Sequence, residues 1–187
     1  MTAEEIIAAI VPAVPGATYL ALASFDAAVT PTIGVAREQI VQTCRALQAP
    51  GLEFVAFSDV TAVDYHPNRL PRFDLVYHLV SPHRRARVRL KVTLNAQEAV
   101  ETLSTLYPGA GWPEREIYDL FGIVFDGHAD MRRLMMPDDW EGHPLRKDYP
   151  VQLRKDAQTY MPLQVTEDEF KANMERDRFQ RGSAKPK

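Results

Sequence analysis

The strongest constraint on the fold is the stretch at residues 86–94, ARVRLKVTL, in which apolar and polar residues alternate without a break. In an extended chain, successive side chains point to opposite faces, so the alternation sorts them into two sets. The sets are Val88, Leu90, Val92 and Leu94 on one face, and Arg87, Arg89, Lys91 and Thr93 on the other. This predicts a strand with one face on a core and the other in contact with water or another molecule. Residues 72–80, RFDLVYHLV, predict a second strand, joined to it by the turn around Pro82.

The residues before these two strands predict a helix, two strands, a second helix and another strand. Thr2 and Glu5 have the spacing of a capping box, which indicates that the first helix begins at once. The second helix is marked by an apolar stripe, made of Ile40, Val41, Cys44 and Leu47. We interpret Cys44 as a core residue, because a buried thiol without a neighbouring base is inert. The expected bounds of the five elements are 2–10, 18–24, 32–36, 37–48 and 52–58.

A polar connection at residues 59–71 and two helices after the strands complete the expected domain. Asn95 and Glu98 have the spacing of a capping box and predict a helix that carries its apolar residues inward. These inward residues are Val100, Leu103, Leu106 and Tyr107. The last helix would begin near Pro113 and end at Gly122, the residue type that most often ends helices.

This order of elements predicts an α+β fold with two layers, in which helices pack on a mixed sheet. At 187 residues, the chain is long enough for one core and an extension. We therefore expect a two-layer domain at residues 1–121, followed by an extended partner-binding segment at residues 122–163. A short helix and a disordered tail are expected at residues 164–187.

The composition argues against several classes of function. The formal net charge is −3 at pH 7, which is unlike a general binder of nucleic acid or anionic membranes. The single cysteine excludes an internal disulfide, and also a zinc or iron–sulfur site built from the thiolates of this chain alone. No apolar run approaches the roughly 18 residues that span a bilayer, and the N-terminus lacks the basic start of a signal peptide. We therefore expect no direct membrane insertion.

Residues 122–150 have neither a helix nor a strand period, although they carry large apolar residues and cations such as Met135, Trp140 and Arg146. A long irregular segment in a compact domain is usually functional or disordered, and disordered segments are poor in large apolar residues. Aromatic residues, Met and Arg are enriched where proteins meet. We therefore predict that this segment is ordered by lying against other chains. The alternatives are an active-site loop and a loop that caps the chain's own domain.

A cluster of acids and histidines in the same region raises the alternative of a stand-alone metal-dependent hydrolase. The candidate ligands are Glu116, Asp119, His128, Asp130, Asp138, Asp139, His143 and Asp148. Their spacing is irregular and no H-E-x-x-H motif is present, so no metal site is expected. Asp119 could instead pair with Arg115, one helical turn away. Asp130 could cap the turn that carries Arg132 and Arg133.

Other catalytic and nucleotide-binding motifs are missing from the sequence. It contains no G-x-G-x-x-G, no P-loop and no G-x-S-x-G. The basic face of the strand at residues 86–94 could hold phosphates. No aromatic ladder accompanies it, however, so a solvated or partner-facing strand is favoured over a nucleic-acid site.

Two segments, EREIYDLFGIVFDGH and DMRRLMMPDDWEGHPLRKDYP, span residues 114–150 around Ala129. They closely resemble the signature region of one family of NADH-quinone oxidoreductase subunits, the C or thirty-kilodalton type of respiratory complex I. Upstream, DVTAVDY, RFDLVYHLVS and RVRLKVTL also resemble this family. The resemblance covers residues 51–151 well and the N-terminal third in outline. Ala129 departs from it, since the family often has proline after the histidine.

The resemblance implies a subunit with an α-β(2)-α-β(3) core, no catalytic residue and no cofactor of its own. Members of the family lie in the peripheral arm, on the cytoplasmic side of the membrane in bacteria. They pack chiefly on the D subunit, the homologue of the hydrogenase large subunit, and lie near the iron–sulfur B and I subunits. The whole complex passes electrons from NADH through FMN and iron–sulfur clusters to a quinone, and pumps protons. The equivalent subunit of a membrane-bound hydrogenase, or of another complex-I-like assembly, is an alternative of the same class.

The resemblance also implies that the contacts with other subunits lie between residues 114 and 149. The expected apolar anchors are Met135, Met136 and Trp140. The expected charge-assisted contacts come from Arg132, Arg133, Arg146 and Lys147. Glu114, Arg115, Glu116 and Asp119 would fix the docking helix and its charged face. His128, His143, Asp148 and Tyr149 complete the expected partner-binding set.

Overall fold

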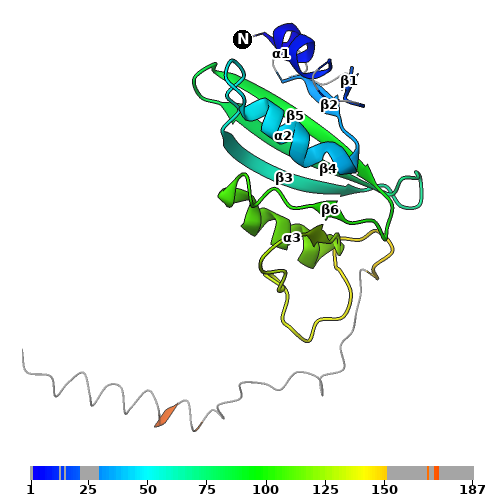
Figure 1. The fold of residues 1–187 in the computed structure, drawn as a ribbon. Coiled ribbons are helices and arrows are strands. Elements are labelled where there is room, and N and C mark those ends of the chain that lie inside the picture. Colours follow the sequence, from blue (N-terminus) through cyan, green and yellow to red (C-terminus); the bar gives the residue numbers. More distant parts are fainter. Residues whose placement is uncertain are drawn as a thin grey trace, which may run out of the picture. The chain divides into compact units, whose positions relative to one another are not determined.

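The computed structural model describes residues 2–12, 14, 16–21, 30–150, 168 and 171–172. Met1–Pro150 form one compact unit, and Val151–Lys187 are grouped as a second. The helices and strands of the first unit are α1 (Ala3–Ile10), β1 (Thr18–Leu20), β2 (Thr32–Gly34), α2 (Ile40–Gln48), β3 (Ala56–Asp64), β4 (Phe73–Ser81), β5 (Ala86–Leu94), β6 (Val100–Glu101), α3 (Gly111–Phe121) and β7 (Phe125–Asp126) (Figure 1). Two short 3₁₀ helices, η1 (Arg37–Gln39) and η2 (Pro108–Ala110), precede α2 and α3. The expected segment at residues 151–163, and most of the expected helix and tail at residues 164–187, lie outside the described residues.

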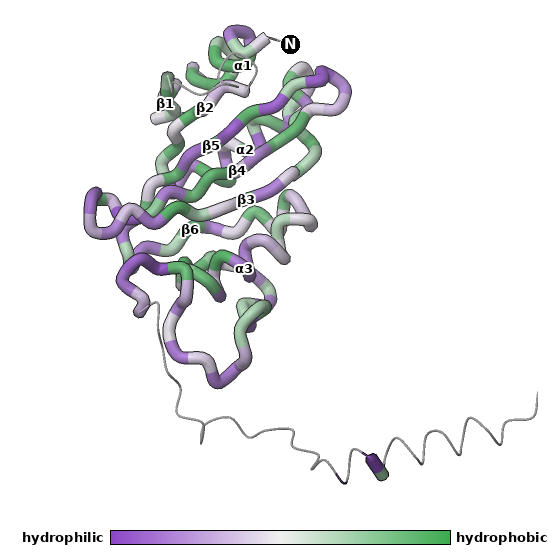
Figure 2. The backbone as a smooth tube through the Cα atoms, turned by 180° about the vertical axis from the view of Figure 1, so that it is seen from behind, coloured by the Kyte–Doolittle hydropathy of each residue, from purple (hydrophilic) through white to green (hydrophobic). Residues whose placement is uncertain are grey.

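Five strands form one mixed sheet in the order β1-β2-β5-β4-β3. β2 pairs in parallel with β5, and the other neighbours pair antiparallel. The longest ladder, between β4 and β5, runs from Phe73 opposite Leu94 to Ser81 opposite Ala86. Figure 1 shows α2 against one face of the sheet, and Figure 2, the view from behind, shows β3, β4 and β5 in front of that helix. The α+β prediction is confirmed, as is the order helix, two strands, helix, three strands.

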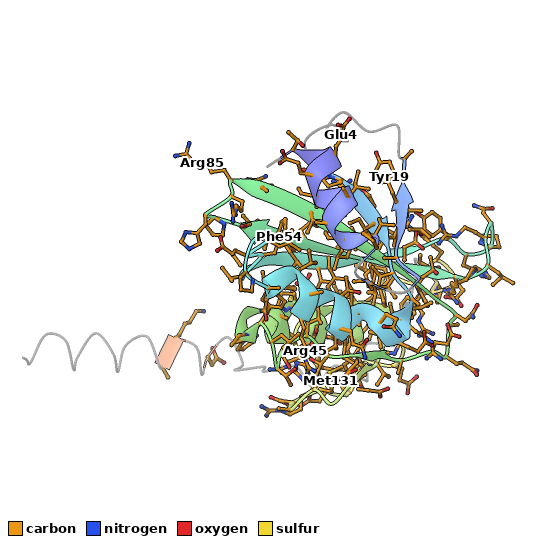
Figure 3. All side chains as sticks on the ribbon, turned by 45° about the horizontal axis from the view of Figure 1, so that its top comes forward. Glu4, Tyr19, Arg45, Phe54, Arg85 and Met131 are labelled. Atoms are coloured by element: carbon orange, nitrogen blue, oxygen red, sulfur yellow. The ribbon has the colours of Figure 1, made fainter. Side chains whose placement is uncertain are left out.

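The core follows the apolar patterns of the sequence. The predicted buried residues of β5 and α2 are all buried, namely Val88, Leu90, Val92, Leu94, Ile40, Val41, Cys44 and Leu47. Burying each such side chain contributes about 1.5–3 kcal/mol. Phe54, just before β3, also lies in the interior, whereas Arg85 extends outward from the turn between β4 and β5 (Figure 3). Burial raises the pKa of the Cys44 thiol to about 12, as expected for a core residue rather than a nucleophile.

The helix predicted to begin at the Asn95 cap and to carry Val100, Leu103, Leu106 and Tyr107 inward is wrong. The capping-box bond from Asn95 N–H to a Glu98 carboxylate oxygen does form, at 2.7 Å, but the chain then continues as β6 and a turn. β6 pairs in parallel with β7. On this ladder the N–H of Val100 donates to the carbonyl oxygen of Val124 at 3.1 Å, and a second bond follows from residue 102 to residue 126. These bonds to a later part of the chain replace the i to i−4 bonds of a helix.

β3 lies later in the chain than predicted, because the sequence placed a strand at residues 52–58 and a polar connection after it. Alternation continues through Val60, Ala62 and Asp64, which are all buried. The sequence pattern resembled a loop because the buried face of this strand carries a carboxylate, that of Asp64. At the N-terminal end of the sheet, β1 and β2 are shorter than expected within the described residues, and residues 22–29 lie outside them.

α3 matches the last predicted helix, and Gly122 ends it in the left-handed conformation with φ +71°. Within the described residues, no helix combines the length and the apolar character needed to cross a membrane. We name residues 122–150 the strap. Apart from β7 the strap has no regular helix or strand, and it belongs to the same compact unit as residues 1–121.

Candidate functional site

The strap is anchored to α3 by the carboxylate of Asp119. This carboxylate accepts the backbone N–H groups of Leu134, Met135 and Met136 at 3.0, 2.6 and 2.8 Å. It also accepts Nη1 of Arg133 at 2.7 Å, and its side chain is completely buried. Burial alone would raise the pKa of Asp119, but these hydrogen bonds outweigh it and the pKa is lowered. A buried negative charge therefore fixes the turn at residues 133–136.

Arg115 contacts the strap rather than Asp119, so the pair suggested by the sequence does not form. Arg115 Nε and Nη2 donate to the carbonyl oxygens of Arg132 and Arg133, both at 3.1 Å. Asp119 instead binds the turn at residues 133–136, which supplies three backbone N–H groups and the Arg133 side chain. The other suggested pairing is confirmed, since the carboxylate of Asp130 accepts the N–H of Arg132 at 3.4 Å and its Nε and Nη2 at 2.8 Å.

The strap also supplies donors for the last carbonyl groups of α3, which have no partner within the helix. His143 Nδ1 donates to the carbonyl oxygen of residue 119 at 2.9 Å. Leu145 N–H donates to that of residue 120 at 3.0 Å, and Arg146 Nε donates to that of residue 121 at 2.5 Å. A carbonyl oxygen only accepts, so Nδ1 of His143 carries a proton. The cation of Arg146 also suits the negative end of the helix dipole. The strap is therefore the C-terminal cap of α3.

The end of the strap is held by Arg72, the residue before β4. Its Nε and Nη2 donate to Asp64 at 2.9 and 2.7 Å, and its Nη1 and Nη2 donate to Asp148 at 2.9 and 2.6 Å. The backbone N–H of Lys147 donates to Asp64 as well, at 2.8 Å. Burial alone would raise the pKa of Asp64, but Arg72 and two backbone N–H groups lower it to about 2. One guanidinium thus joins the end of β3 to the end of the strap.

The start of the strap is held near the other end of α3 by His128, whose Nε2 also lies 3.9 Å from the carboxylate of Glu114. The buried carboxylate of Glu114 accepts Leu103 N–H at 2.8 Å and contacts the Thr102 hydroxyl. Burial raises the pKa of Glu114, although these hydrogen bonds oppose the rise. His128 accepts the N–H of Asp130 at Nδ1, at 3.0 Å. Its proton is therefore on Nε2, which donates to the carbonyl of the first α3 residue at 3.1 Å.

These contacts divide the predicted partner-binding residues by exposure. Glu114 and Asp119 are buried. The half-buried residues are Arg115, His128, Arg133, Met136, Trp140, His143, Arg146 and Tyr149. The exposed residues are Glu116, Arg132, Met135, Lys147 and Asp148. The carboxylates of Glu114 and Asp119 bind groups of the same chain, so they do not form the charged docking face that the sequence suggested. The strap is also bound by groups of its own domain, through Asp119 and Asp64. That it lies against other chains stays a prediction.

Large apolar side chains are exposed along the same part of the chain. Trp112 is 64% exposed, Met135 60% and Leu145 48%. Of the three apolar anchors predicted from the sequence, only Met135 is exposed, because Met136 and Trp140 are half-buried. Exposed apolar residues on an ordered surface are suited to bind a protein rather than to catalyse a reaction.

Sequence reasoning did not predict the role of Asp64 and Arg72 in holding the strap. It placed Asp64 in a polar connection and Arg72 at the start of a strand. A signal was present, because the alternation of Val60 and Ala62 places Asp64 on the buried face. A buried carboxylate needs a cation or several donors, and Arg72 is the nearest arginine that begins a strand. The contact of this pair with Asp148 could not be inferred, since 76 residues separate Arg72 from Asp148.

The alternative functions find little support in the geometry. In the part of the chain that the structure describes, no three His, Cys, Asp or Glu side chains are placed to hold a metal ion. Asp119 and Asp130, which a hydrolase would need, are bound by arginines and backbone N–H groups. On the basic strand face, Lys91 pairs with the buried Asp74 at 2.6 Å, and Arg89 donates to the Thr32 hydroxyl at 3.4 Å. This face is therefore partly neutralised within the chain.

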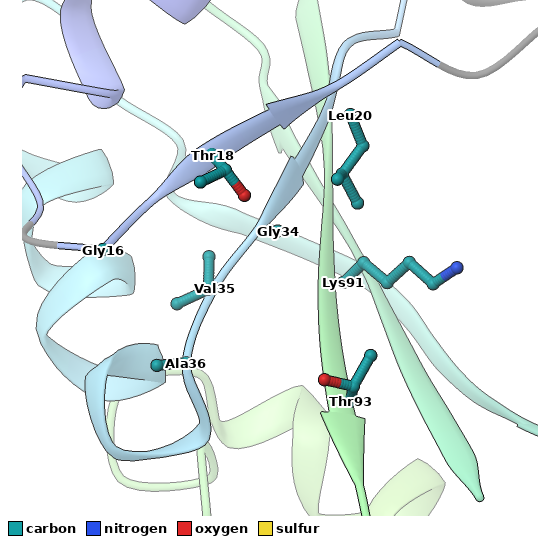
Figure 4. A pocket seen from close by; sticks show the side chains of 8 residues that line it. All are labelled: Gly16, Thr18, Leu20, Gly34, Val35, Ala36, Lys91 and Thr93. Atoms are coloured by element: carbon teal, nitrogen blue, oxygen red, sulfur yellow. The ribbon is translucent and has the colours of Figure 1, made fainter. Parts of the chain in front are cut away.

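A hollow of about 400 Å³ lies beside the basic face, where β1, β2 and β5 meet (Figure 4). The missing side chain of Gly34 opens it, because a Cβ there would lie 3.0 Å from the Thr18 hydroxyl oxygen. Thr18 and Thr93 contribute hydroxyl groups, and the ammonium group of Lys91 is bound to Asp74. The described residues that line the hollow offer no acid–base pair, so it does not support catalysis.

The family described as respiratory-chain NADH dehydrogenase, 30 Kd subunit, matches residues 33–155. Two relatives, each named as the C subunit of NADH-quinone oxidoreductase, come from Geobacter sulfurreducens and Geobacter metallireducens. Each is 48% identical over 122 residues, which is 65% of this chain and 75% of the relative. A relative of the same name from Rhodopseudomonas palustris is 48% identical over 121 residues, 64% of this chain and 59% of the relative.

Two solved structures share the fold. A trypsin-resistant fragment of Nqo5 has a TM-score of 0.54 and 27% identity, and the match covers 68% of this chain and 96% of that one. A chain of the membrane-bound sulfane sulfur reductase, an archaeal respiratory membrane complex, has a TM-score of 0.67 and 25% identity, covering 88% of this chain and 94% of that one. The family match begins within β2 and includes the rest of the sheet and the whole strap. The chain belongs to the family of the 30 kDa subunit of respiratory-chain NADH dehydrogenase.

Proposed function

We propose that the chain is a structural subunit in the peripheral arm of a proton-pumping NADH-quinone oxidoreductase. The family match and the names of the relatives support this role. In it, the chain has no catalytic residue and binds no cofactor, and FMN and the iron–sulfur clusters of the complex lie on other subunits. The single cysteine fits this proposal, because Cys44 is buried in the core and its pKa is raised to about 12.

The observation that carries the proposal is the ordered strap with exposed apolar side chains. Bonds of Asp119, Arg146 and Arg72 join the strap to α3 and to the start of β4, so the surface is formed before any partner arrives. A preformed surface loses less conformational entropy on binding than a disordered one. Met135 and Leu145 would be the apolar contacts of the strap, and Trp112 on α3 would add an aromatic one. Arg132, Glu116 and Lys147 are exposed and would form the polar rim.

The partners that we propose are other subunits of the peripheral arm. The main one is the D subunit, the homologue of the hydrogenase large subunit, and the B and I subunits would lie nearby. In this arrangement the chain is peripheral, on the cytoplasmic side of the membrane, and is attached through its partners. The lack of a membrane-spanning helix among the described residues is compatible with this attachment.

A second candidate of the same class is the equivalent subunit of another respiratory membrane complex. The match to a chain of the archaeal sulfane sulfur reductase supports it, with a TM-score of 0.67 and 25% identity over 88% of this chain. An activity assay of the purified complex distinguishes between the two candidate functions. Reduction of a quinone by NADH supports the first, and a complex that does not oxidise NADH supports the second.

The docking role is tested by co-expressing the chain with the other peripheral-arm subunits of its organism and purifying the complex through a tag on this chain. Met135→Glu places a charge in the proposed interface, so the amount of partner recovered should fall at least about tenfold. Val55→Glu is the matched control, because Val55 is 52% exposed and lies before β3, outside the strap. It should leave recovery unchanged.

Both variants change exposed side chains, so the melting temperature of the chain alone should stay within about 2 °C of the wild type. If the wild-type chain recovers none of these subunits, the assembly role is wrong. If Met135→Glu recovers as much partner as Val55→Glu, the strap is not the docking surface.

A further inference from the structure

The loop at residues 65–71, between β3 and β4, carries Leu70, which is 84% exposed. No other large apolar side chain among the described residues is as exposed. Single exposed apolar residues are common on protein surfaces, so exposure alone does not indicate a partner. The way in which this loop is held, its position and its charge give the reason to consider one.

The loop is fixed by its own polar groups, while Leu70 takes no part in these contacts. Tyr65 N–H donates to the Arg72 carbonyl at 3.0 Å, and Asn68 N–H donates to the Tyr65 carbonyl at 2.7 Å. The guanidinium of Arg69 lies 3.8 Å from the centre of the Tyr65 ring and contacts the buried carboxylate of Asp74. An apolar side chain on a fixed loop needs little further ordering to enter a pocket, so its burial would contribute to binding with a small entropic cost.

The loop is continuous with the end of the strap. Asp64 and Arg72 flank the loop on either side, and these two residues bind the strap through Lys147 N–H and the Asp148 carboxylate. In both Figure 1 and Figure 2, the loop after β3 and the end of the strap lie at the same end of the sheet. A polypeptide that covers the end of the strap therefore lies within reach of the loop.

A small excess of positive charge surrounds Leu70. The cations on either side of it, Arg69 and Arg72, and the nearby Lys91 bind the carboxylates of Asp64, Asp74 and Asp148. The end of the strap adds two further cations, Arg146 and Lys147, and the side chain of Lys147 is exposed. The surface that accepts Leu70 would therefore be apolar at its centre and acidic at its rim.

We propose that Leu70 is an anchor residue that inserts into an apolar pocket with an acidic rim on the same neighbouring polypeptide that covers the strap. This inference rests on the proposed docking function and extends the interface from the strap to the loop at residues 65–71. It also assigns a role in binding to Arg72, because its bonds to Asp64 and Asp148 hold the two parts of the interface in one arrangement.

Site-specific photo-cross-linking tests the position of the loop in the assembled complex. The photoreactive amino acid p-benzoylphenylalanine is placed at position 70 or at position 135 of the full chain, which is co-expressed with the other peripheral-arm subunits. Both positions should cross-link to the same polypeptide. If position 135 cross-links and position 70 does not, or if the two reach different polypeptides, the inference is wrong and the docking function still stands. If neither cross-links and the wild-type chain recovers no partner, both are wrong.

A pair of substitutions tests whether the side chain contributes to binding. Leu70→Ser should reduce the recovery of the partner about tenfold, whereas Val55→Ser, at the opposite end of β3, should not change it. Lys147→Glu should also reduce recovery, and Lys147→Arg should keep it, because the rim requires a cation. An equal loss for Leu70→Ser and Val55→Ser, or no loss for Leu70→Ser, would overturn the assignment of Leu70 as an anchor.

Discussion

At the scale of single residues, the strap depends on a few charged side chains of the domain rather than on an apolar core of its own. Asp119 gathers three backbone N–H groups and one arginine, and Arg72 bridges two carboxylates. An irregular segment must satisfy its backbone groups without a helix or a sheet, and buried charges do this with few residues. Such a charge is costly to leave unpaired, so each of these residues should matter far more than its neighbours.

Asp119→Asn tests the anchor. The amide keeps the shape of the side chain but removes the charge that balances Arg133, and its NH₂ group faces donors rather than acceptors. We expect the free energy of unfolding to fall by about 3 kcal/mol, measured by urea denaturation of the full chain. Asp139→Asn, which changes an exposed acid of the same segment, should stay within about 0.5 kcal/mol of the wild type. Equal small effects for both would show that Asp119 does not hold the strap.

The pKa of Asp64 predicts how stability depends on pH. Its pKa is lowered from 3.8 to about 2 in the folded chain, so its ionised form is stabilised by folding. That stabilisation is fully present above the unfolded pKa and is lost as the pH falls through the folded pKa. Between pH 4 and pH 2 the wild type should therefore lose about 2 kcal/mol that Asp64→Asn does not lose. Urea denaturation at a series of pH values measures this. Parallel losses in the two proteins would rule out this role for Asp64.

At the scale of elements, α3 and the strap complete each other. The helix ends at Gly122, and the carbonyls of its last turn are bound by His143, Leu145 and Arg146 of the strap. The sequence predicted the helix and its glycine cap, because both depend on residues close together in the chain. It did not predict the donors, which lie 24 to 25 residues away.

Gly122→Ala tests this junction. Gly122 has φ +71°, and an added Cβ would lie 2.4 Å from the His143 ring and 2.6 Å from Arg146 Nη2. The substitution therefore combines backbone strain with a clash, and we expect a loss of at least about 2 kcal/mol in the free energy of unfolding. Gly109→Ala is the control, since a Cβ there would meet no atom within 4 Å, and its effect should be below about 1 kcal/mol. Thermal unfolding of the two variants gives the comparison. A tolerated alanine at position 122 would mean that His143 and Arg146 do not pack against this glycine.

At the scale of the whole molecule, the local patterns of the sequence were sufficient for the sheet and its helix. The unbroken alternation of β5 and the apolar stripe of α2 each fix one buried face, and both are buried as predicted. The failures come from contacts between distant residues. Val100, Leu103 and Tyr107 are buried at helical spacing, but β7 and Glu114 bind the backbone of this segment. In the same way, the strap has no helix or strand period, and its pattern gave no sign of the charges on α3 and β3 that hold it.

Contacts within the chain hold the strap, and our proposal that it binds other subunits takes it to be formed before they bind. Hydrogen–deuterium exchange of the full chain alone tests this most directly, at the amides of Leu134, Met135, Met136 and Lys147, which donate to Asp119 and Asp64. We predict that these amides exchange at least about 100-fold more slowly than in an unfolded chain, an opening free energy of about 3 kcal/mol. Exchange at the unfolded rate in the chain alone, with protection only in the assembled complex, would show instead that the partners order the strap.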